Sequence, residues 1–206
     1  ITMGSLGGAQ KYVFDLIEAF ANVYDITLAI GKDGSQDLQK RILSLAQKRG
    51  TSVRLVTLTH LRRDIHPIDD TLAILEIRAL VNHIKPDIIH FNSTKAGILG
   101  SLATKHAKAK KVYTAHGWVF HEPMHRFKKS MYTFLEKRSG KRIDTIITLN
   151  SNDTRSAMLL WSGLSRPQIV EQKLAMHPVS FLSREQAQLA LNVHKLNEKK
   201  EADTPL

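Results

Sequence analysis

Four polar side chains in the middle of the chain could bind an anion or a set of hydroxyl groups. They follow an apolar segment, residues 87–91, and precede a run of small residues typical of a helix, residues 96–107: Asn92, Ser93, Thr94 and Lys95. Amide, hydroxyl and ammonium donors at a helix N-terminus, where the helix dipole is positive, suit a phosphate or the hydroxyls of a sugar. Capping of the helix by Ser93 or Thr94 would explain one hydroxyl. It would not explain Lys95, because a cation is unfavourable in a first turn.

A histidine and a glycine follow the next apolar segment, residues 111–115. At this position His116 could donate a hydrogen bond to a ligand or stabilise developing charge, with Gly117 beside it as a further contact. His116 could equally well be bonded to a neighbouring backbone group. A metal site is not expected, since the spacing of His116, His121 and His125 matches no familiar zinc pattern and the chain has no cysteine.

A glycine-rich turn, residues 4–8, precedes a segment with helical apolar spacing, residues 10–22. The order of its glycines does not meet the G-x-G-x-x-G fingerprint of nicotinamide and flavin sites. Gly7 and Gly8, followed by Gln10, would let a diphosphate come close to the free N–H groups of that helix. A plain tight turn explains the same residues, and the glycines alone do not decide between the two.

Strand and helix patterns alternate along the chain, which is typical of an α/β protein. Residues 1–3 look like the stub of a strand, and the other strands are expected at 25–30, 53–58, 87–91, 111–115, 144–149 and 168–174. Helices are expected at 10–22, 36–49, 68–84, 96–107, 125–142, 151–161 and 183–199. We therefore predict a single Rossmann-like, doubly wound, mainly parallel sheet. Ligands bind at the carboxyl ends of the strands in such sheets, so residues 92–95 and 116–118 should line one crevice.

Two helices carry apolar stripes that we expect to face the core. The stripes consist of Ile68, Leu72, Leu75 and Ala79 in one helix, and of Phe127, Met131, Phe134 and Leu135 in the other. In the helix between them, Gly97 and Gly100 would allow close packing against the sheet.

Positive charge is concentrated in one part of the chain. The net charge is +11, and residues 105–142 carry eleven Lys or Arg against two Glu, a net +9. Such a patch indicates an anionic partner: phosphate groups, an acidic membrane surface or nucleic acid. No basic–aromatic motif of an RNA-binding fold is present, so we expect no nucleic acid. With no apolar run long enough to span a membrane and no signal-peptide pattern, we expect a cytoplasmic protein that could lie at the inner face of the membrane.

Several segments together resemble a known family. The sequences GGAQKY (7–12), KPDIIHFNSTKAGILG (85–100), VYTAHGWVF (112–120) and D-x-I-I-T (144–148) resemble the N-terminal domain of GT-B glycosyltransferases of family 4. The nearest likeness is to enzymes that build bacterial surface polysaccharides, and it runs from about residue 4 to about residue 189.

The resemblance implies a division of labour between two Rossmann-like domains. The N-terminal domain would hold the acceptor, and a C-terminal domain would hold the nucleotide-sugar. Gly7, Gly8 and Gln10 would approach the donor diphosphate, and His116 would contact the transferred sugar. The acceptor side would be formed by Asn92, Ser93, Thr94, Lys95 and Gly117. Such enzymes retain the anomeric configuration and need no bound metal.

The sequence also departs from the family pattern. Residues 1–206 contain the pattern of one α/β domain and not of two, residues 174–179 lack the usual Asn-Gly turn, and Ser101 stands where an Arg is usual. We therefore expect an acceptor domain at 1–180 and a terminal helix with an interdomain tail at 181–206, inactive without a C-terminal domain. The acceptor would be lipid-linked or a polysaccharide. The alternative is a non-catalytic basic module that binds anionic membranes or phosphorylated ligands.

Overall fold

A computed structural model describes residues 1–5, 7–164 and 167–172. Its helices are α1 (Gly8–Phe20), α2 (Ser35–Arg49), α3 (Pro67–Ile84), α4 (Thr94–Ala103), α5 (Arg126–Gly140) and α6 (Ser151–Leu160), with a 3-10 turn at Val119–His121. Its strands are β1 (Ile26–Gly31), β2 (Val53–Leu58), β3 (Ile88–Phe91), β4 (Lys110–Ala115), β5 (Thr145–Thr148) and β6 (Gln168–Glu171). The helix predicted at 183–199 and the domain boundary predicted near 180 lie outside the described residues.

All strand pairs are parallel, as expected, but the strands form two hydrogen-bonded sets. β1 pairs with β2, and the other four strands follow in the order β3-β4-β5-β6. The first residues connect the two sets. Ile1 accepts a hydrogen bond from the Gly31 N–H at 3.0 Å, and the Thr2 hydroxyl lies 2.6 Å from the hydroxyl of Ser93, just after β3. The predicted strand stub at 1–3 thus bonds along β1, although it is too short to count as a strand.

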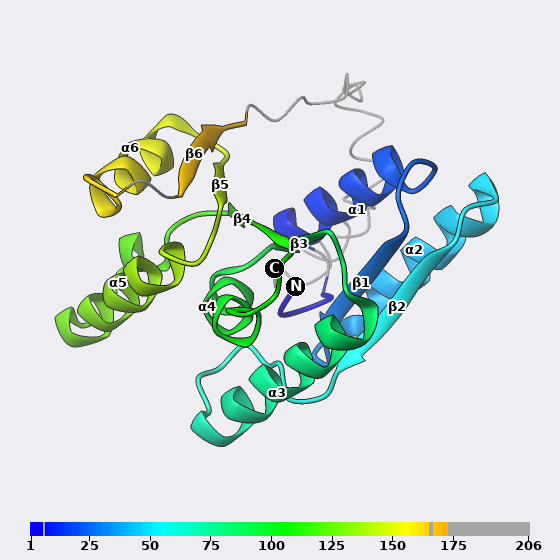
Figure 1. Cartoon of the computed structure of the whole chain (residues 1–206), viewed down its shortest axis with the longest axis horizontal. Coiled ribbons are helices and arrows are strands. Elements are labelled where there is room, and N and C mark those ends of the chain that lie inside the picture. Colours follow the sequence, from blue (N-terminus) through cyan, green and yellow to red (C-terminus); the bar gives the residue numbers. More distant parts are fainter. Residues whose placement is uncertain (6, 165–166, 173–206) are drawn as a thin grey trace, which may run out of the picture. The chain divides into compact units, whose positions relative to one another are not determined.

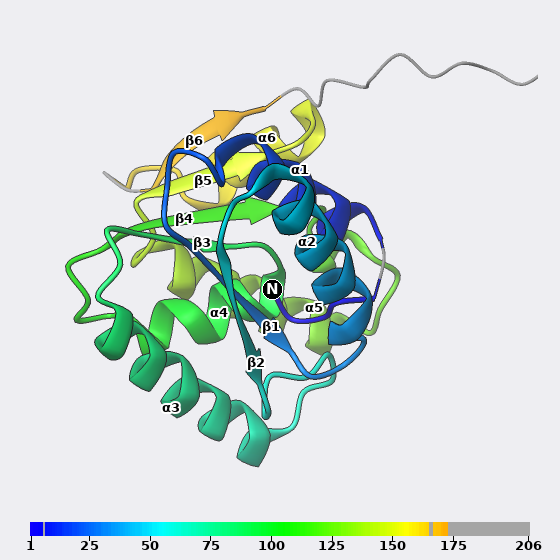
Figure 2. The same cartoon turned by 90° about the vertical axis from the view of Figure 1, so that its right-hand side faces the viewer.

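Helices cover both faces of β1, as the alternation of its side chains requires. Leu28 and Ile30 point into a core formed with α1 and α2. Ala29 between them packs against a second core, formed with α3 and α4. Figures 1 and 2 show α1 and α2 on one side of β1 and β2, and α3 on the other. The predicted doubly wound α/β arrangement is confirmed.

The stripe predicted on α3 is wrong. Ile68 is 69% exposed and Leu75 is 51% exposed, whereas Ala73 and Ile77 are buried. The helix is apolar on more than one side, so spacing alone could not identify the face that packs. The face with the small Ala73 lies against Ile98, Leu99 and Ala103 of α4, since a small side chain lets the two helices approach closely.

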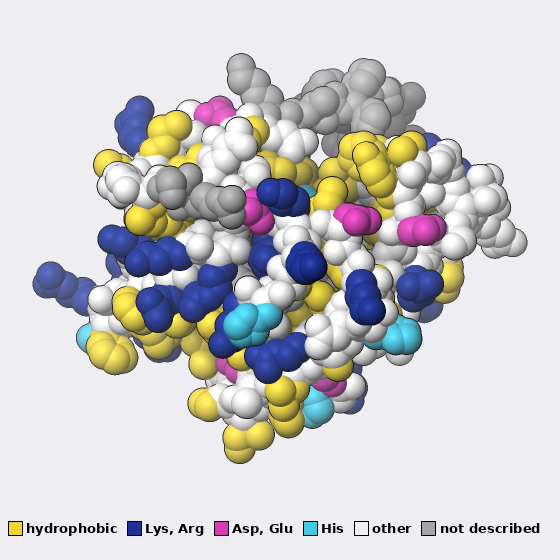
Figure 3. All heavy atoms as spheres, viewed as in Figure 1, with side chains coloured by type: hydrophobic (Ala, Val, Ile, Leu, Met, Phe, Trp, Pro, Cys, Tyr) yellow, Lys and Arg dark blue, Asp and Glu magenta, His cyan; other side chains and the backbone are white. Residues whose placement is uncertain are grey.

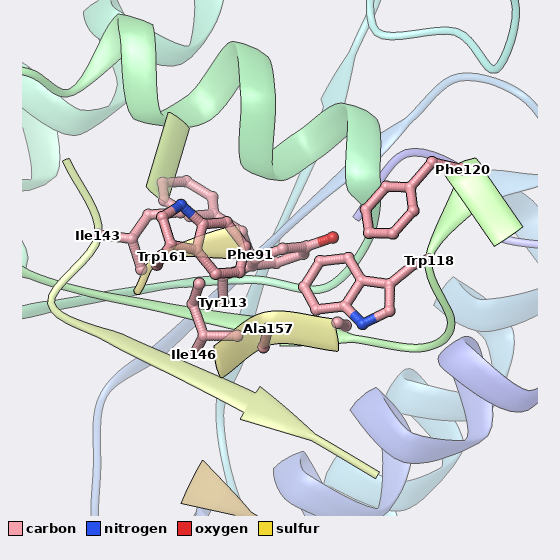
Figure 4. Close-up of a cluster of buried hydrophobic side chains, with 9 residues drawn as sticks. Phe91, Tyr113, Trp118, Phe120, Ile143, Ile146, Ala157 and Trp161 are labelled. Atoms are coloured by element: carbon pink, nitrogen blue, oxygen red, sulfur yellow. The ribbon is translucent and has the colours of Figure 1, made fainter. Parts of the chain in front are cut away.

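An aromatic cluster fills the space between β4 and the helices α4, α5 and α6, and Figure 4 shows its side chains. The indoles of Trp118 and Trp161 lie 5.6 Å apart, and the Trp118 ring stacks on Phe120 at 5.4 Å. The expected role of the glycines in α4 is confirmed. A Cβ on Gly97 would lie 3.3 Å from the Tyr113 ring, and one on Gly100 would lie 2.3 Å from the Phe91 ring.

Helix α4 is shorter than predicted, because it ends at Ala103 rather than near residue 107. The Thr104 hydroxyl donates to the Gly100 carbonyl at 2.7 Å and so satisfies one of the last carbonyls of the helix. Helix α6 begins at Ser151, as predicted. Its N-cap is Asn150, whose side chain accepts a hydrogen bond from the Asp153 N–H at 2.9 Å.

The stripe predicted on α5 is wrong for its two phenylalanines. Phe127 is 73% exposed and Phe134 is 65% exposed. The buried residues of the helix are Glu136, Ser139 and Gly140. A Cβ on Gly140 would lie only 2.2 Å from the Trp161 indole nitrogen, so the lack of a side chain there decides which face of α5 meets the core.

The close approach of α4 to β3 gives a stability prediction. Replacing Gly100→Ala should lower the free energy of unfolding by about 1–3 kcal/mol, because the added methyl group meets the buried Phe91 ring. Gly8→Ala is the matched control, since a Cβ there meets nothing within 4 Å. Urea denaturation followed by circular dichroism measures both variants. Equal stability of the two would contradict the packing described.

Candidate functional site

The residues singled out in the sequence come together at the carboxyl edge of the strands. Residues 92–95 follow β3, and residues 116–118 follow β4, its parallel neighbour. Two contacts attach the N-terminal part of the chain to this edge. One is the Thr2–Ser93 hydrogen bond. The other is an edge-on contact between the rings of Tyr12, in α1, and His116, with centroids 5.1 Å apart.

His116 carries a neutral imidazole with a free ring nitrogen. Burial lowers the pKa of His116 to about 4, so the ring is uncharged near neutral pH. Its Nε2 is buried and has no hydrogen-bond partner among the described residues. Gly117 follows with φ +122°, a conformation that favours glycine, and is exposed. A neutral imidazole with one unpartnered nitrogen can exchange a hydrogen bond with a ligand hydroxyl.

A network of polar side chains lies beneath His116, and the sequence interpretation missed it. The His90 Nε2 lies 2.8 Å from the Thr114 hydroxyl. The Tyr12 hydroxyl accepts from Thr114 at 3.5 Å and donates to Gln172 at 2.8 Å. Burial, followed by repulsion from His116, lowers the pKa of His90 to about 4. A histidine inside an apolar strand was the one signal in the sequence that could have revealed this network.

The glycine turn leaves the start of α1 open. Gly7 is the N-cap in extended conformation, and no acidic residue occupies the first turn. Both Gly7 and Gly8 are exposed. The Gln10 side-chain amide donates to the Met3 carbonyl at 2.8 Å, so this part of Gln10 holds the turn. The free N–H groups of the first turn can therefore receive an anion.

The turn after β3 has both a structural role and an unpaired polar group. Ser93 is the N-cap of α4, accepting from the Ala96 N–H at 3.3 Å. Asn92 is 6% exposed, and its Oδ1 has no hydrogen-bond partner among the described residues. The Thr94 hydroxyl lies 3.4 Å from the Tyr113 hydroxyl. Asn92 is thus the member of this turn whose bonding capacity remains available.

Lys95 reaches the same edge, but its charge has a partner within the protein. Its ammonium lies 2.5 Å from Oδ1 of Asp70 in the first turn of α3, and it also donates to the Asp64 carbonyl. The contact with Asp70 is an ion pair rather than a well-directed hydrogen bond, because that oxygen has no partner of good geometry. This pair explains how a cation is tolerated in the first turn of α4.

A buried carboxyl group lies behind this turn. Glu136 in α5 is 1% exposed and accepts a hydrogen bond from the Tyr113 hydroxyl at 3.2 Å. Its other oxygen is buried without a partner among the described residues, and burial raises the pKa of Glu136 to about 7. Sequence patterns did not reveal this role, because Lys and Arg surround Glu136 and it lies outside the apolar stripe predicted for the helix.

Within the described residues, no group of three or more His, Asp or Glu side chains is placed to hold a metal ion. In the same part of the chain, no helix combines the length and the apolar character that crossing a bilayer requires.

Sequence comparisons connect the chain with enzymes that transfer sugars. Residues 6–170 match the family model described as Glycosyltransferase Family 4. The chain is 29% identical over 153 residues to the UDP-Gal:alpha-D-GlcNAc-diphosphoundecaprenol alpha-1,3-galactosyltransferase of Escherichia coli, covering 73% of the chain and 37% of that protein. It is 29% identical over 102 residues to the putative glycosyltransferase EpsD of Bacillus subtilis (strain 168), covering 48% of the chain and 26% of EpsD.

Structure comparison gives the same fold. Anabaena HepE, solved in complex with UDP, matches 92% of the chain with a TM-score of 0.57 at 15% identity. HepE in complex with UDP-glucose matches with a TM-score of 0.56. The chain covers 48% of HepE, so it spans less than half the length of the relatives and structures to which it is similar.

The two histidines at this edge give a pH prediction. Burial favours their neutral forms, so both should take up a proton only near pH 4 and should stay neutral from pH 8 down to about pH 5. The stability that they contribute is present above their unfolded pKa of about 6.5 and is lost as the pH falls through 4. NMR titration of the imidazole ¹³C and ¹⁵N shifts tests this, with the same titration of the chain in denaturant as control. Titration of His116 near pH 6.5 in the folded protein would show that its imidazole is solvated.

Proposed function

The chain belongs to glycosyltransferase family 4, and on that premise we propose that it is the acceptor-binding half of a retaining enzyme. This enzyme transfers a sugar from a nucleotide-sugar to a lipid-linked or polysaccharide acceptor. We propose further that the chain does not turn over alone, since the donor would be held mainly by a second domain. The chain covers less than half of the length of the relatives to which it is similar.

The observation that carries the proposal is the position of His116 beside the helix that begins at Gly8. The ring of Tyr12, one turn into α1, lies 5.1 Å from the imidazole. The open N-terminus of α1 and the free Nε2 of His116 therefore belong to one edge of the molecule. Two such groups, an anion-binding helix end and a neutral hydrogen-bonding ring, match the two parts of a sugar diphosphate.

The transfer breaks the bond between the anomeric carbon and a diphosphate oxygen and forms a bond from that carbon to the oxygen of an acceptor hydroxyl, whose proton passes to the leaving diphosphate. Negative charge grows on the leaving diphosphate, and the free N–H groups at Gly7 and Gly8 would stabilise it. Neutral His116 would bond a hydroxyl of the sugar near the reacting carbon. The UDP and UDP-glucose complexes of the HepE fold support a uridine nucleotide as donor. No step in this proposal requires a metal.

The acceptor would lie against the turn after β3 and against Gly117. Asn92, with its unpaired Oδ1, would accept a hydrogen bond from an acceptor hydroxyl, and Ser93 and Thr94 would flank it. Lys95 would edge the cleft and orient the turn through Asp70. The Escherichia coli relative is named for a diphosphoundecaprenol acceptor, which supports a lipid-linked acceptor for this chain also.

Helix α5 would place the protein on the membrane that holds such a lipid. Phe127 and Phe134 are exposed on this helix, and Phe134 lines a shallow groove together with Arg126, Lys129, Ser130, Thr133 and Lys137. Figure 3 shows dark blue side chains gathered over α5, with yellow ones beside them. Cations next to protruding rings suit an anionic membrane surface. The protein would then be peripheral at the cytoplasmic face.

The catalytic role of His116 is tested in a chimera of this chain with the C-terminal half of the Escherichia coli relative. We expect the chimera to transfer galactose from UDP-galactose to a diphosphoundecaprenol-linked acceptor. His116→Ala should reduce kcat about 100-fold or more, because a transition-state contact is lost. His83→Ala, at an exposed site on α3, should leave kcat unchanged.

UDP affinity, measured in the same chimera, distinguishes a loss of catalysis in His116→Ala from a loss of nucleotide binding. It should stay within about twofold in the His116→Ala variant, since the ring contacts sugar rather than nucleotide. A chimera that folds and binds UDP but transfers no sugar to any lipid-linked or glycan acceptor would contradict the proposed function. Unchanged kcat in His116→Ala would remove the catalytic role of this histidine.

Membrane contact by α5 is tested by flotation with vesicles. The chain should bind vesicles with acidic lipids and not neutral ones, and 0.5 M salt should release it. Phe127→Ser/Phe134→Ser should weaken binding at least about tenfold, because two aromatic side chains no longer enter the bilayer interface. Phe20→Ser/Val23→Ser, at exposed apolar positions near the end of α1, should bind like the wild type. An equal loss of vesicle binding in the two double variants would exclude α5 as the membrane contact.

A further inference from the structure

A second polar hollow lies at the opposite end of β4 from His116. It is formed by residues 105–111, which lead from α4 into β4, and by residues 141–144, which lead from α5 into β5. β4 runs from Lys110 to Ala115, so about 20 Å of extended chain separates the hollow from His116. The hollow, here called the amino-end hollow, is therefore separate from the proposed transfer site.

The lining of the amino-end hollow is strongly basic. Its cationic residues are Lys105, Lys108, Lys110, Lys111, Lys141 and Arg142. The one acidic residue in the lining is Asp144, whose carboxylate accepts a hydrogen bond from the Lys111 backbone N–H at 2.9 Å. The six positive groups repel one another, and one carboxylate offsets only part of their charge. A bound anion would relieve this repulsion.

Lys111 distinguishes this hollow from a merely charged surface. The Lys111 residue is only 8% exposed. Its ammonium donates to the carbonyls of Ala107 at 3.1 Å and Ala109 at 3.2 Å. These carbonyls are neutral, so they satisfy two of its three N–H groups without balancing its charge. Because burial of an ammonium is costly, a counter-charge in the hollow would stabilise this arrangement.

The shape of the hollow is suited to a small ligand. Its volume is about 390 Å³, within the range of about 300–1,000 Å³ typical of small-molecule sites. Lys105 and Lys108 come from one loop, and Lys141 and Arg142 come from the other, so the cations converge from two sides. Convergent ammonium and guanidinium groups suit the oxygens of a phosphate or a diphosphate.

We propose that the amino-end hollow binds a phosphate-bearing ligand at a site distinct from the sugar-transfer edge. The phosphate would be held by Lys108 and Lys141 from the two loops, with Lys111 behind them. One source of this group is a free phosphorylated metabolite. The other is the headgroup of an anionic lipid, since the hollow lies at the end of α5. The proposal does not depend on the transferase activity.

The test is a titration of the whole chain with inorganic pyrophosphate at low ionic strength, followed by amide and lysine shifts in NMR. We expect saturable binding, with shifts at residues 105–111 and 141–144. Lys108→Gln/Lys141→Gln should weaken it about tenfold, because two charge-assisted contacts are lost. Lys40→Gln/Lys48→Gln removes the same charge from exposed positions on α2, and its affinity should remain within about twofold of wild type.

Vesicles that contain phosphatidic acid identify the source of the phosphate. If pyrophosphate displaces the chain from these vesicles and Lys108→Gln/Lys141→Gln binds them less tightly, the site takes a lipid headgroup. If pyrophosphate binds but leaves vesicle binding unchanged, the site takes a free ligand. Both outcomes support the proposal. Absence of pyrophosphate binding, equal loss in both double variants, or shifts confined to the first turn of α1 would overturn it.

Discussion

Parallel pairing of β3, β4, β5 and β6 is the constraint on which the rest of the structure depends. In this register Ala115, Thr148 and Glu171 lie side by side at the ends of β4, β5 and β6, and β3 ends two residues earlier, with Phe91 opposite Tyr113. The loops that follow β3 and β4 must then be neighbours, although a whole helix separates them in sequence. The same pairing makes the loops before β4 and β5 neighbours at the other edge. Two different polar surfaces thus arise from one set of backbone hydrogen bonds.

Burial of β4 fixes the positions of the groups at both of its ends. Tyr113, Thr114 and Ala115 are fully buried, and the aromatic cluster on one face leaves little space for this strand to shift. On the other side, the Thr114 hydroxyl connects His90 with Tyr12. The imidazole that follows is therefore held by a rigid strand and an aromatic neighbour, which is the kind of support that a site for sugar transfer needs.

The sequence predicted the architecture well, because alternating strand and helix patterns depend on local residue types. The strand at 53–58 has the predicted bounds, and the edge shared by the residues after β3 and β4 followed from the rule for parallel sheets. The packing faces of α3 and α5 could not be predicted in this way. Both are decided by residues without large side chains, Ala73 and Gly140, which permit close approach but leave no mark in an apolar pattern.

Polar partners distant in sequence were equally beyond prediction. Capping of α4 left Lys95 unexplained, and its partner Asp70 belongs to a different helix. The network of His90, Thr114 and Tyr12 joins three elements, and only their arrangement in space makes it visible. For the roles of the individual site residues, the resemblance to the family gave proposals, and the geometry of the edge gives physical reasons to test them.

The carboxyl group of Glu136 couples this fold to proton uptake. In the unfolded chain it would ionise near its ordinary value of 4.5, whereas in the folded protein it keeps its proton up to about pH 7. Between these values the folded state binds one proton more than the unfolded state, so the free energy of unfolding falls as the pH rises. Folding in this range draws a proton from the buffer, and calorimetric enthalpies therefore contain a contribution from buffer ionisation.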